Sequence, residues 1–195
     1  MSDGLQPNRV CYTEDSNRWP EFVTRAFTAF GFEVDHFETN SGAWEDPERG
    51  IFHNPGRHDV YVFDNDTGPD SIEGPELIKR LLTLPRELDR DIIVIILSSS
   101  NPGIFTDRGI RTLREQHHIQ LCWKPDSWCL QAEYARNRID QKATYTFEEW
   151  ILETRDIDLS RRGSDNQLSK ANDELFEKVR QIEAEREGKV RGQLK

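Results

Sequence analysis

The hydrophobic positions of the first 140 residues alternate between short apolar runs and stretches with helical spacing. The apolar runs, which predict strands, cover residues 10–13, 32–37, 59–63, 92–97 and 119–123. Residues 92–97 are six consecutive aliphatic positions, a pattern typical of a central parallel strand that is covered on both faces. The sequence therefore predicts five strands, of which the fourth lies deepest in the core.

Helical spacing fills most of the intervals between these runs. Apolar residues recur three and four positions apart from Trp19 to Phe30, and Gly31 ends this pattern. Further helices are predicted over residues 77–82, behind Pro75, and over 104–117 and 126–139. Strands and helices in alternation predict an α/β fold in which helices wrap an open parallel sheet.

The sequence becomes more polar beyond residue 140. Residues 145–152 contain a compact apolar cluster, residues 161–166 have the composition of a linker, and Leu168, Leu175 and Ile182 lie seven positions apart. We expect one domain over 1–140, followed by a linker and a C-terminal helical extension over 141–195. The extension is interpreted as a charged, solvated helix or as a short helix for dimerisation or for a partner, so a homodimer stays open.

Composition argues against several classes of protein. Asp and Glu outnumber Lys and Arg by 36 to 26, and the net charge of −10 argues against nucleic-acid binding. No apolar run approaches the roughly 20 residues that span a bilayer, and the N-terminus lacks the pattern of a signal peptide. Three scattered cysteines indicate reduced thiols rather than a metal site. We therefore expect a cytoplasmic protein that binds neither nucleic acid nor membranes.

Polar residues stand at the carboxyl ends of four predicted strands. In chain order they are Glu14 and Asp15, Asp64 and Asp66, Ser98, and Lys124. Because polar chemistry in open α/β sheets collects at this edge, we expect these residues to converge on one pocket.

Each of these residue types suits phosphoryl transfer. Adjacent carboxylates repel one another and favour a cation, and a small site with only oxygen ligands suits Mg²⁺. Asp64 can attack phosphorus and form an aspartyl phosphate. The Lys124 ammonium can pair with the new phosphoryl oxygens, and the Ser98 hydroxyl can donate to another of them.

Residues 8–140 resemble the receiver domain of two-component response regulators. The resemblance rests on Glu14-Asp15, on the strand that ends in Asp64, on the helix start Gly74-Pro75, on Ser98, and on Lys124-Pro125. It implies a flavodoxin-like, doubly wound sheet of five parallel strands in the order 2-1-3-4-5. It also implies a receiver that stands alone, apart from its helical tail.

The resemblance assigns the phosphoacceptor and the metal ligands. Asp64 would accept the phosphoryl group. Asp15, Asp64 and the backbone carbonyl of Asp66 would hold Mg²⁺, and Glu14 would act partly through water.

The remaining roles concern the phosphoryl group and its source. Ser98 and Lys124 would contact the phosphoryl group, which a histidine kinase or a phosphotransfer protein would donate. The phosphorylated form would then act on a downstream protein target. Such a switch catalyses only its own phosphorylation and dephosphorylation.

Two other interpretations stay open. The segment from Asp64 to Gly68 resembles the Asp-x-Asp motif of haloacid-dehalogenase-type phosphatases, in which Asp64 would be the nucleophile and Asp66 the general acid. That motif should end the first strand of the core, whereas two predicted strands precede it here. The second alternative is a degenerate receiver that folds but acts as an unphosphorylated adaptor.

Overall fold

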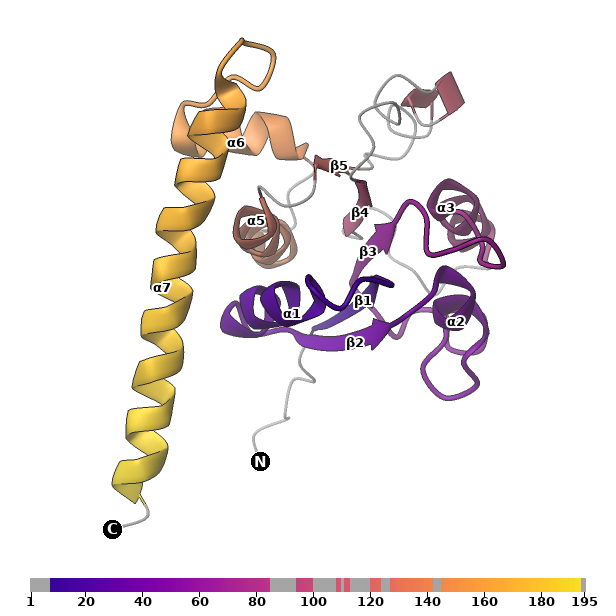
Figure 1. Ribbon diagram of the computed structural model, residues 1–195, viewed down its shortest axis with the longest axis horizontal. Coiled ribbons are helices and arrows are strands. Elements are labelled where there is room, and N and C mark those ends of the chain that lie inside the picture. The colour runs from indigo at the N-terminus through magenta and orange to yellow at the C-terminus, as the bar shows by residue number, and fades with distance from the viewer. Residues whose placement is uncertain are drawn as a thin grey trace.

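The computed structural model describes residues 8–84, 94–99, 108–109, 111–112, 120–123, 127–141 and 145–193. Within this part of the chain, five parallel strands form one sheet (Figure 1). They are β1 (Arg9–Thr13), β2 (Glu33–Phe37), β3 (Val60–Asp64), β4 (Val94–Ser99) and β5 (Gln120–Trp123). Their order is β2-β1-β3-β4-β5, which confirms the doubly wound topology that the resemblance implied.

Helices cover both faces of this sheet. Helices α1 (Pro20–Ala29) and α5 (Trp128–Gln141) lie on one face, and α2 (Asn40–Glu45) and α3 (Gly74–Thr83) lie on the other (Figure 1). Because side chains alternate along a strand, β1 contributes Val10 and Tyr12 to the core under α1 and α5, and Cys11 to the core under α2 and α3. Cys11 and Cys129 are both buried free thiols, as the sequence predicted.

The predicted elements match the structure closely where it is described. The five strands are present, with bounds that shift by one or two residues. Helix α2 was not predicted from the sequence. The predicted helix over 104–117 and the predicted helix start at Asp126 lie largely outside the described residues.

Two helices follow the sheet, α6 (Phe147–Arg155) and α7 (Ser164–Gln193). A capping box begins α6, because the Thr146 hydroxyl accepts from the Glu149 amide while the Glu149 carboxylate accepts from the Thr146 amide. Helix α7 lies alongside α1 and α5 (Figure 1). None of the described helices combines the length and apolar character needed to cross a bilayer.

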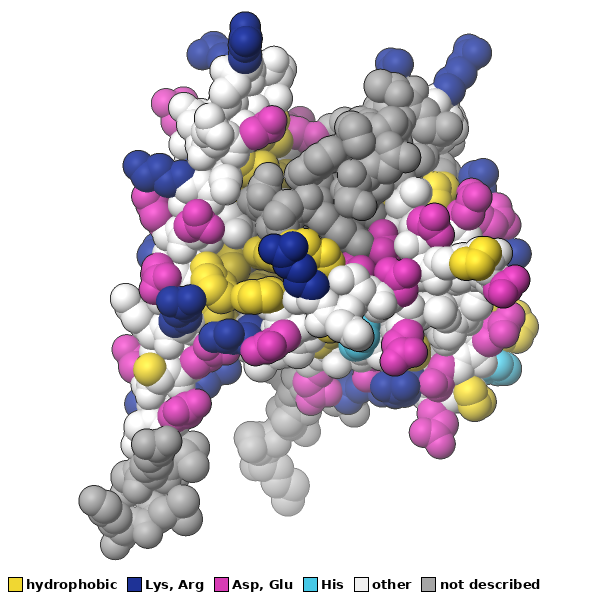
Figure 2. All heavy atoms as spheres, viewed as in Figure 1, with side chains coloured by type: hydrophobic (Ala, Val, Ile, Leu, Met, Phe, Trp, Pro, Cys, Tyr) yellow, Lys and Arg dark blue, Asp and Glu magenta, His cyan; other side chains and the backbone are white. Residues whose placement is uncertain are grey.

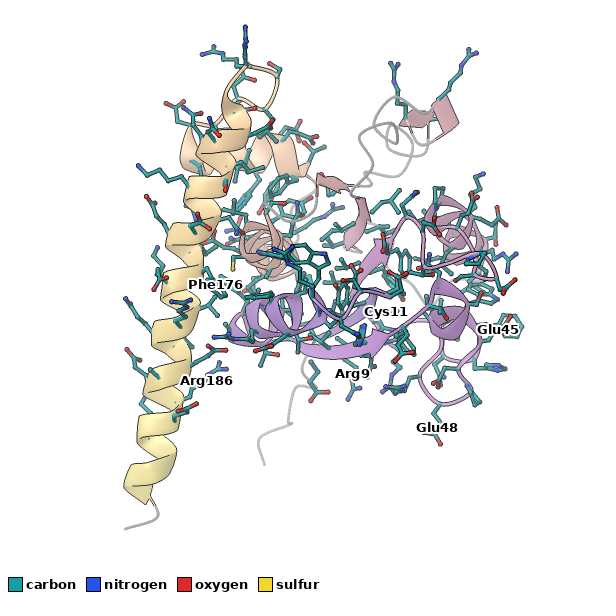
Figure 3. All side chains as sticks on the ribbon, viewed as in Figure 1. Arg9, Cys11, Glu45, Glu48, Phe176 and Arg186 are labelled. Carbon is teal, nitrogen blue, oxygen red and sulfur yellow. The ribbon has the colours of Figure 1, made fainter. Side chains whose placement is uncertain are left out.

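One face of α7 belongs to the hydrophobic core. Leu175 and Val179 are buried in the cluster that α1 and α5 share with the sheet. Hydrophobic side chains fill the junction between α7 and the body in Figure 2, and Phe176 points from α7 toward the body in Figure 3. A bidentate ion pair from Arg25 to Glu183, at 3.0 and 2.7 Å, adds a polar contact. The expectation of a solvated helix is therefore wrong for the face of α7 that carries Leu175 and Val179, whereas the opposite face is exposed.

We predict that Leu175→Ala lowers the free energy of unfolding by about 2–5 kcal/mol, because the side chain leaves a cavity in the shared core. Urea denaturation measures this change. Lys178→Ala, on the exposed face of the same helix, is the matched control and should change stability by no more than about 0.5 kcal/mol. Equal effects of the two substitutions would show that α7 does not pack on the body in solution.

Candidate functional site

Three carboxylates meet at the carboxyl edge of the sheet. Glu14 and Asp15 directly follow β1, and Asp64 is the last residue of the neighbouring strand β3. One carboxylate oxygen from each of the three lies within 4.8 Å of the others. Glu14 and Asp64 are 1% and 5% exposed, whereas Asp15 is exposed to solvent. The structure thus brings together three residues that the sequence singled out, and we name them the acid cluster.

Hydrogen bonds hold the Glu14 member of the acid cluster. The Tyr12 hydroxyl donates to one carboxylate oxygen at 3.4 Å, and the Ser16 amide donates to the other at 3.2 Å. The Glu14 amide donates to the Phe37 carbonyl at the end of β2. Burial, with the nearby carboxylates of Glu14 and Asp64, raises the pKa of Tyr12, so its hydroxyl stays protonated and remains a donor.

Close packing fixes the chain directly after Asp64. The Gly74 amide donates to the Asn65 carbonyl at 2.9 Å, which draws the start of α3 against the end of β3. A Cβ at position 74 would lie 2.6 Å from the Asp64 carbonyl oxygen and 2.6 Å from a methyl group of Leu97. Glycine is therefore required here because backbone approaches backbone.

The strand register places Ser98 next to Asp64. These two residues are paired across β3 and β4, and Ser98 is paired in turn with Cys122 of β5. Lys124 follows the end of β5 by one position. The side chains of Ser98 and Lys124 lie outside the described residues, so their roles stay predictions.

Asp66 stands apart from the acid cluster. Its side chain is exposed, and its carboxylate accepts a hydrogen bond from the Gly68 amide at 3.0 Å within the loop after β3. Among the described residues, the group of close carboxylates contains Asp64 but does not contain Asp66. This placement does not favour Asp66 as a general acid next to a nucleophilic Asp64.

Two buried polar residues behind the acid cluster were not identified from the sequence. They are Thr13, the last residue of β1, and Asn40, the first residue of α2, and both are fully buried. The only sequence signal for Thr13 is a hydroxyl that ends an otherwise apolar strand, and Asn40 follows the Thr39 helix cap without a pattern of its own.

A cavity of about 300 Å³ lies between α1, α5 and α7. Its walls include Trp19 and Trp128, whose ring centroids are 4.9 Å apart, and Phe176. The Arg18 guanidinium lies 4.3 Å from the centre of the Trp19 ring. Trp19 stands just before α1, four positions after Asp15 in the same loop, so its fluorescence reports on changes in that loop.

Solved structures with the same architecture are receiver domains. A response regulator receiver domain protein from Clostridium thermocellum superposes with a TM-score of 0.53 at 12% identity, covering 69% of this chain and 96% of that one. CheY-like receiver domains from Methanospirillum hungatei and Methylobacillus flagellatus give TM-scores of 0.52 and 0.53 at 16% and 17% identity, and cover 70% and 68% of this chain and 96% and 98% of theirs.

The chain has the receiver-domain fold. No family model and no curated protein matches its sequence. The receiver fold places the acid cluster at the carboxyl edge of neighbouring strands, where open α/β sheets bind their ligands.

We predict that Asp15→Asn raises the melting temperature in EDTA by roughly 2–4 °C, because removing one charge relieves repulsion within the acid cluster. Thermal unfolding followed by circular dichroism measures the shift. Glu153→Gln removes one exposed carboxylate from α6, far along the chain from the cluster, and should leave the melting temperature nearly unchanged. An Asp15→Asn protein that melts at or below the wild-type temperature would contradict the close approach of these carboxylates.

Proposed function

We propose that this protein is a phosphoaccepting signalling switch of the two-component type, phosphorylated on Asp64 with Mg²⁺ bound at the acid cluster. The observation that carries the proposal is the close approach of the Glu14, Asp15 and Asp64 carboxylates at the carboxyl edge of a receiver fold. Such a set of like charges is unfavourable without a cation, and a strained arrangement of this kind is common at functional sites.

The acid cluster suits Mg²⁺ because its ligands are all oxygens and its members lie within reach of one ion. Asp15, Asp64 and the backbone carbonyl of Asp66 would be direct ligands, and Glu14 would act partly through water. Bound Mg²⁺ would supply positive charge that offsets the charge of the carboxylates and of an incoming phosphoryl group.

The reaction is a transfer of one phosphoryl group to a carboxylate. A carboxylate oxygen of Asp64 attacks phosphorus, the bond from phosphorus to the donor nitrogen breaks, and the electron pair leaves with the donor imidazole. Attack of water on the same phosphorus later releases phosphate and restores the carboxylate.

Ser98 and Lys124 would contact the transferred group. The register that pairs Ser98 with Asp64 supports this role, because it brings the end of β4 beside the acceptor. The ammonium of Lys124 would pair with phosphoryl oxygens as a point charge, and the Ser98 hydroxyl would donate to another oxygen.

A histidine kinase or a phosphotransfer protein would be the donor, and a downstream protein would be the target. We assign the phosphorylation switch to the domain over residues 1–140. The downstream protein would bind a surface of this domain whose conformation changes when Asp64 gains the phosphoryl charge. The extension over 141–195 contributes α6 and α7, and α7 contacts α1 and α5.

The phosphatase alternative has less support. Asp64 ends the third strand of the chain rather than the first, and the Asp66 carboxylate is bonded to its own loop. The two functions differ in stoichiometry, because a phosphatase turns over many substrate molecules whereas a switch takes up one equivalent.

We predict that wild-type protein with Mg²⁺ takes up one phosphoryl group from acetyl phosphate, and that beryllofluoride, a phosphoryl mimic, changes its tryptophan fluorescence. Intact mass measures the uptake. Asp64→Asn should abolish both responses, because it removes the nucleophile.

The matched control is Asp66→Asn, which keeps the main-chain carbonyl and should retain uptake of one equivalent. In a phosphatase of the Asp-x-Asp type, the same substitution would abolish steady release of phosphate from p-nitrophenyl phosphate. A wild-type protein that responds to neither acetyl phosphate nor beryllofluoride would overturn the proposal and leave the unphosphorylated adaptor.

A further inference from the structure

The hydrogen-bonded pairing of β1 with β3 ends before it reaches the acceptor. Its last pair is Tyr12 with Val62, two residues short of Asp64. The main-chain N–H and C=O of Asp64 are bonded by side chains instead. The Asp64 amide donates to the Thr13 hydroxyl at 2.9 Å, and the Asp64 carbonyl accepts from the Asn40 side-chain amide at 2.9 Å. These two side chains thus continue the contact between β1 and β3 beyond the last paired residues, as far as Asp64.

The two side chains are also bonded to each other. The Thr13 hydroxyl donates to the Asn40 side-chain carbonyl at 2.6 Å, and the Asn40 side-chain amide donates a second time, to the Ile72 carbonyl at 2.8 Å. The donor and acceptor assignments of these hydrogen bonds are mutually consistent. The Asp64 amide can only donate, so the Thr13 hydroxyl accepts there and turns its proton to Asn40, which leaves the Asn40 amide nitrogen facing Asp64.

The same network reaches the loop that follows the acceptor. The Asn40 main-chain amide donates to the Thr67 hydroxyl at 2.9 Å, and that hydroxyl donates to the Ser71 hydroxyl at 2.7 Å. Asn40 therefore contacts the end of β3, the loop after it and the segment before α3. A buried polar network in which each group has a partner favours a single backbone arrangement.

Neither Thr13 nor Asn40 contributes charge to the acid cluster. Burying a hydroxyl and an amide is unfavourable unless each is bonded, and here their bonds go to the main chain of Asp64. Thr13 also immediately precedes Glu14 and Asp15 in the chain. One side chain thus joins the strand that carries two members of the acid cluster to the strand that carries the third.

We propose that Thr13 and Asn40 are positioning residues for phosphoryl transfer, which fix the Asp64 peptide and thereby aim its carboxylate at the metal and the donor. This inference rests on the proposed function. The pair acts through the main chain of the acceptor and does not touch the phosphoryl group.

The experiment compares Thr13→Val, which keeps the shape but removes the hydroxyl, with Thr13→Ser, which keeps the hydroxyl. Single-turnover phosphorylation by acetyl phosphate is measured well below the melting temperature. At saturating Mg²⁺ and acetyl phosphate, Thr13→Val should lower the rate constant roughly 10- to 100-fold, the scale expected when a reacting group is slightly misplaced. Thr13→Ser should restore most of the rate, and the KM for acetyl phosphate should change little.

Three further measurements separate positioning from loss of stability. Leu175→Ala lowers stability in the core shared by α1, α5 and α7, outside the Thr13–Asn40 network, and should leave the rate constant unchanged. Amide exchange followed by NMR should show faster exchange of the Asp64 N–H in Thr13→Val than in Thr13→Ser. Asn40→Ala provides a second variant and should lower the rate constant in the same direction.

The outcomes distinguish this inference from the proposed function. A wild-type protein that is phosphorylated, with Thr13→Val and Asn40→Ala reacting at the wild-type rate, would overturn positioning and leave the switch intact. Rate losses in Thr13→Val that Leu175→Ala reproduces would also overturn it, because they would reflect stability alone. A wild-type protein that takes up no phosphoryl group would overturn both.

Discussion

Repulsion among three carboxylates is the constraint on which the rest of this structure depends. Glu14, Asp15 and Asp64 can stay within 4.8 Å of one another only because two neighbouring strands end at the same edge of the sheet. The strands themselves are held by side chains with almost no exposure, such as Val10, Val60 and Val94. Apolar burial far from the edge thus balances unfavourable electrostatics at the edge, a distribution typical of functional sites.

The buried polar side chains of Thr13 and Asn40 hold the Asp64 main chain in one position relative to the acid cluster. Apolar packing alone tolerates small shifts of a strand. The hydrogen bonds between the Asp64 main chain and the side chains of Thr13 and Asn40 form only within a narrow range of distances and angles. Gly74 adds a steric limit, because a larger residue would meet the Asp64 carbonyl. The position of the Asp64 peptide is therefore limited both by hydrogen bonds and by close packing.

Most of the fold follows from local patterns, and the exceptions have physical reasons. The strands were predictable because runs of apolar residues, such as residues 94–97 of β4, are buried in the sheet. Helix α2 was missed because its six residues complete fewer than two turns, and its stability comes from the Thr39 cap and tertiary contacts. The approach of Glu14, Asp15 and Asp64 was predictable from strand ends. The roles of Thr13 and Asn40 were not, because these two side chains bond mainly to backbone groups, which no side-chain pattern reveals.

The packing of α7 has a consequence for how the chain acquires its structure during synthesis. Leu175 and Val179 complete a core whose other buried residues all lie earlier in the chain. Until those two residues leave the ribosome, the apolar surface of α1 and α5 that they cover faces solvent. The nascent sheet and its first helices therefore keep part of their apolar surface exposed until α7 has been synthesised, and a chaperone that binds exposed apolar surface has a defined interval in which to act.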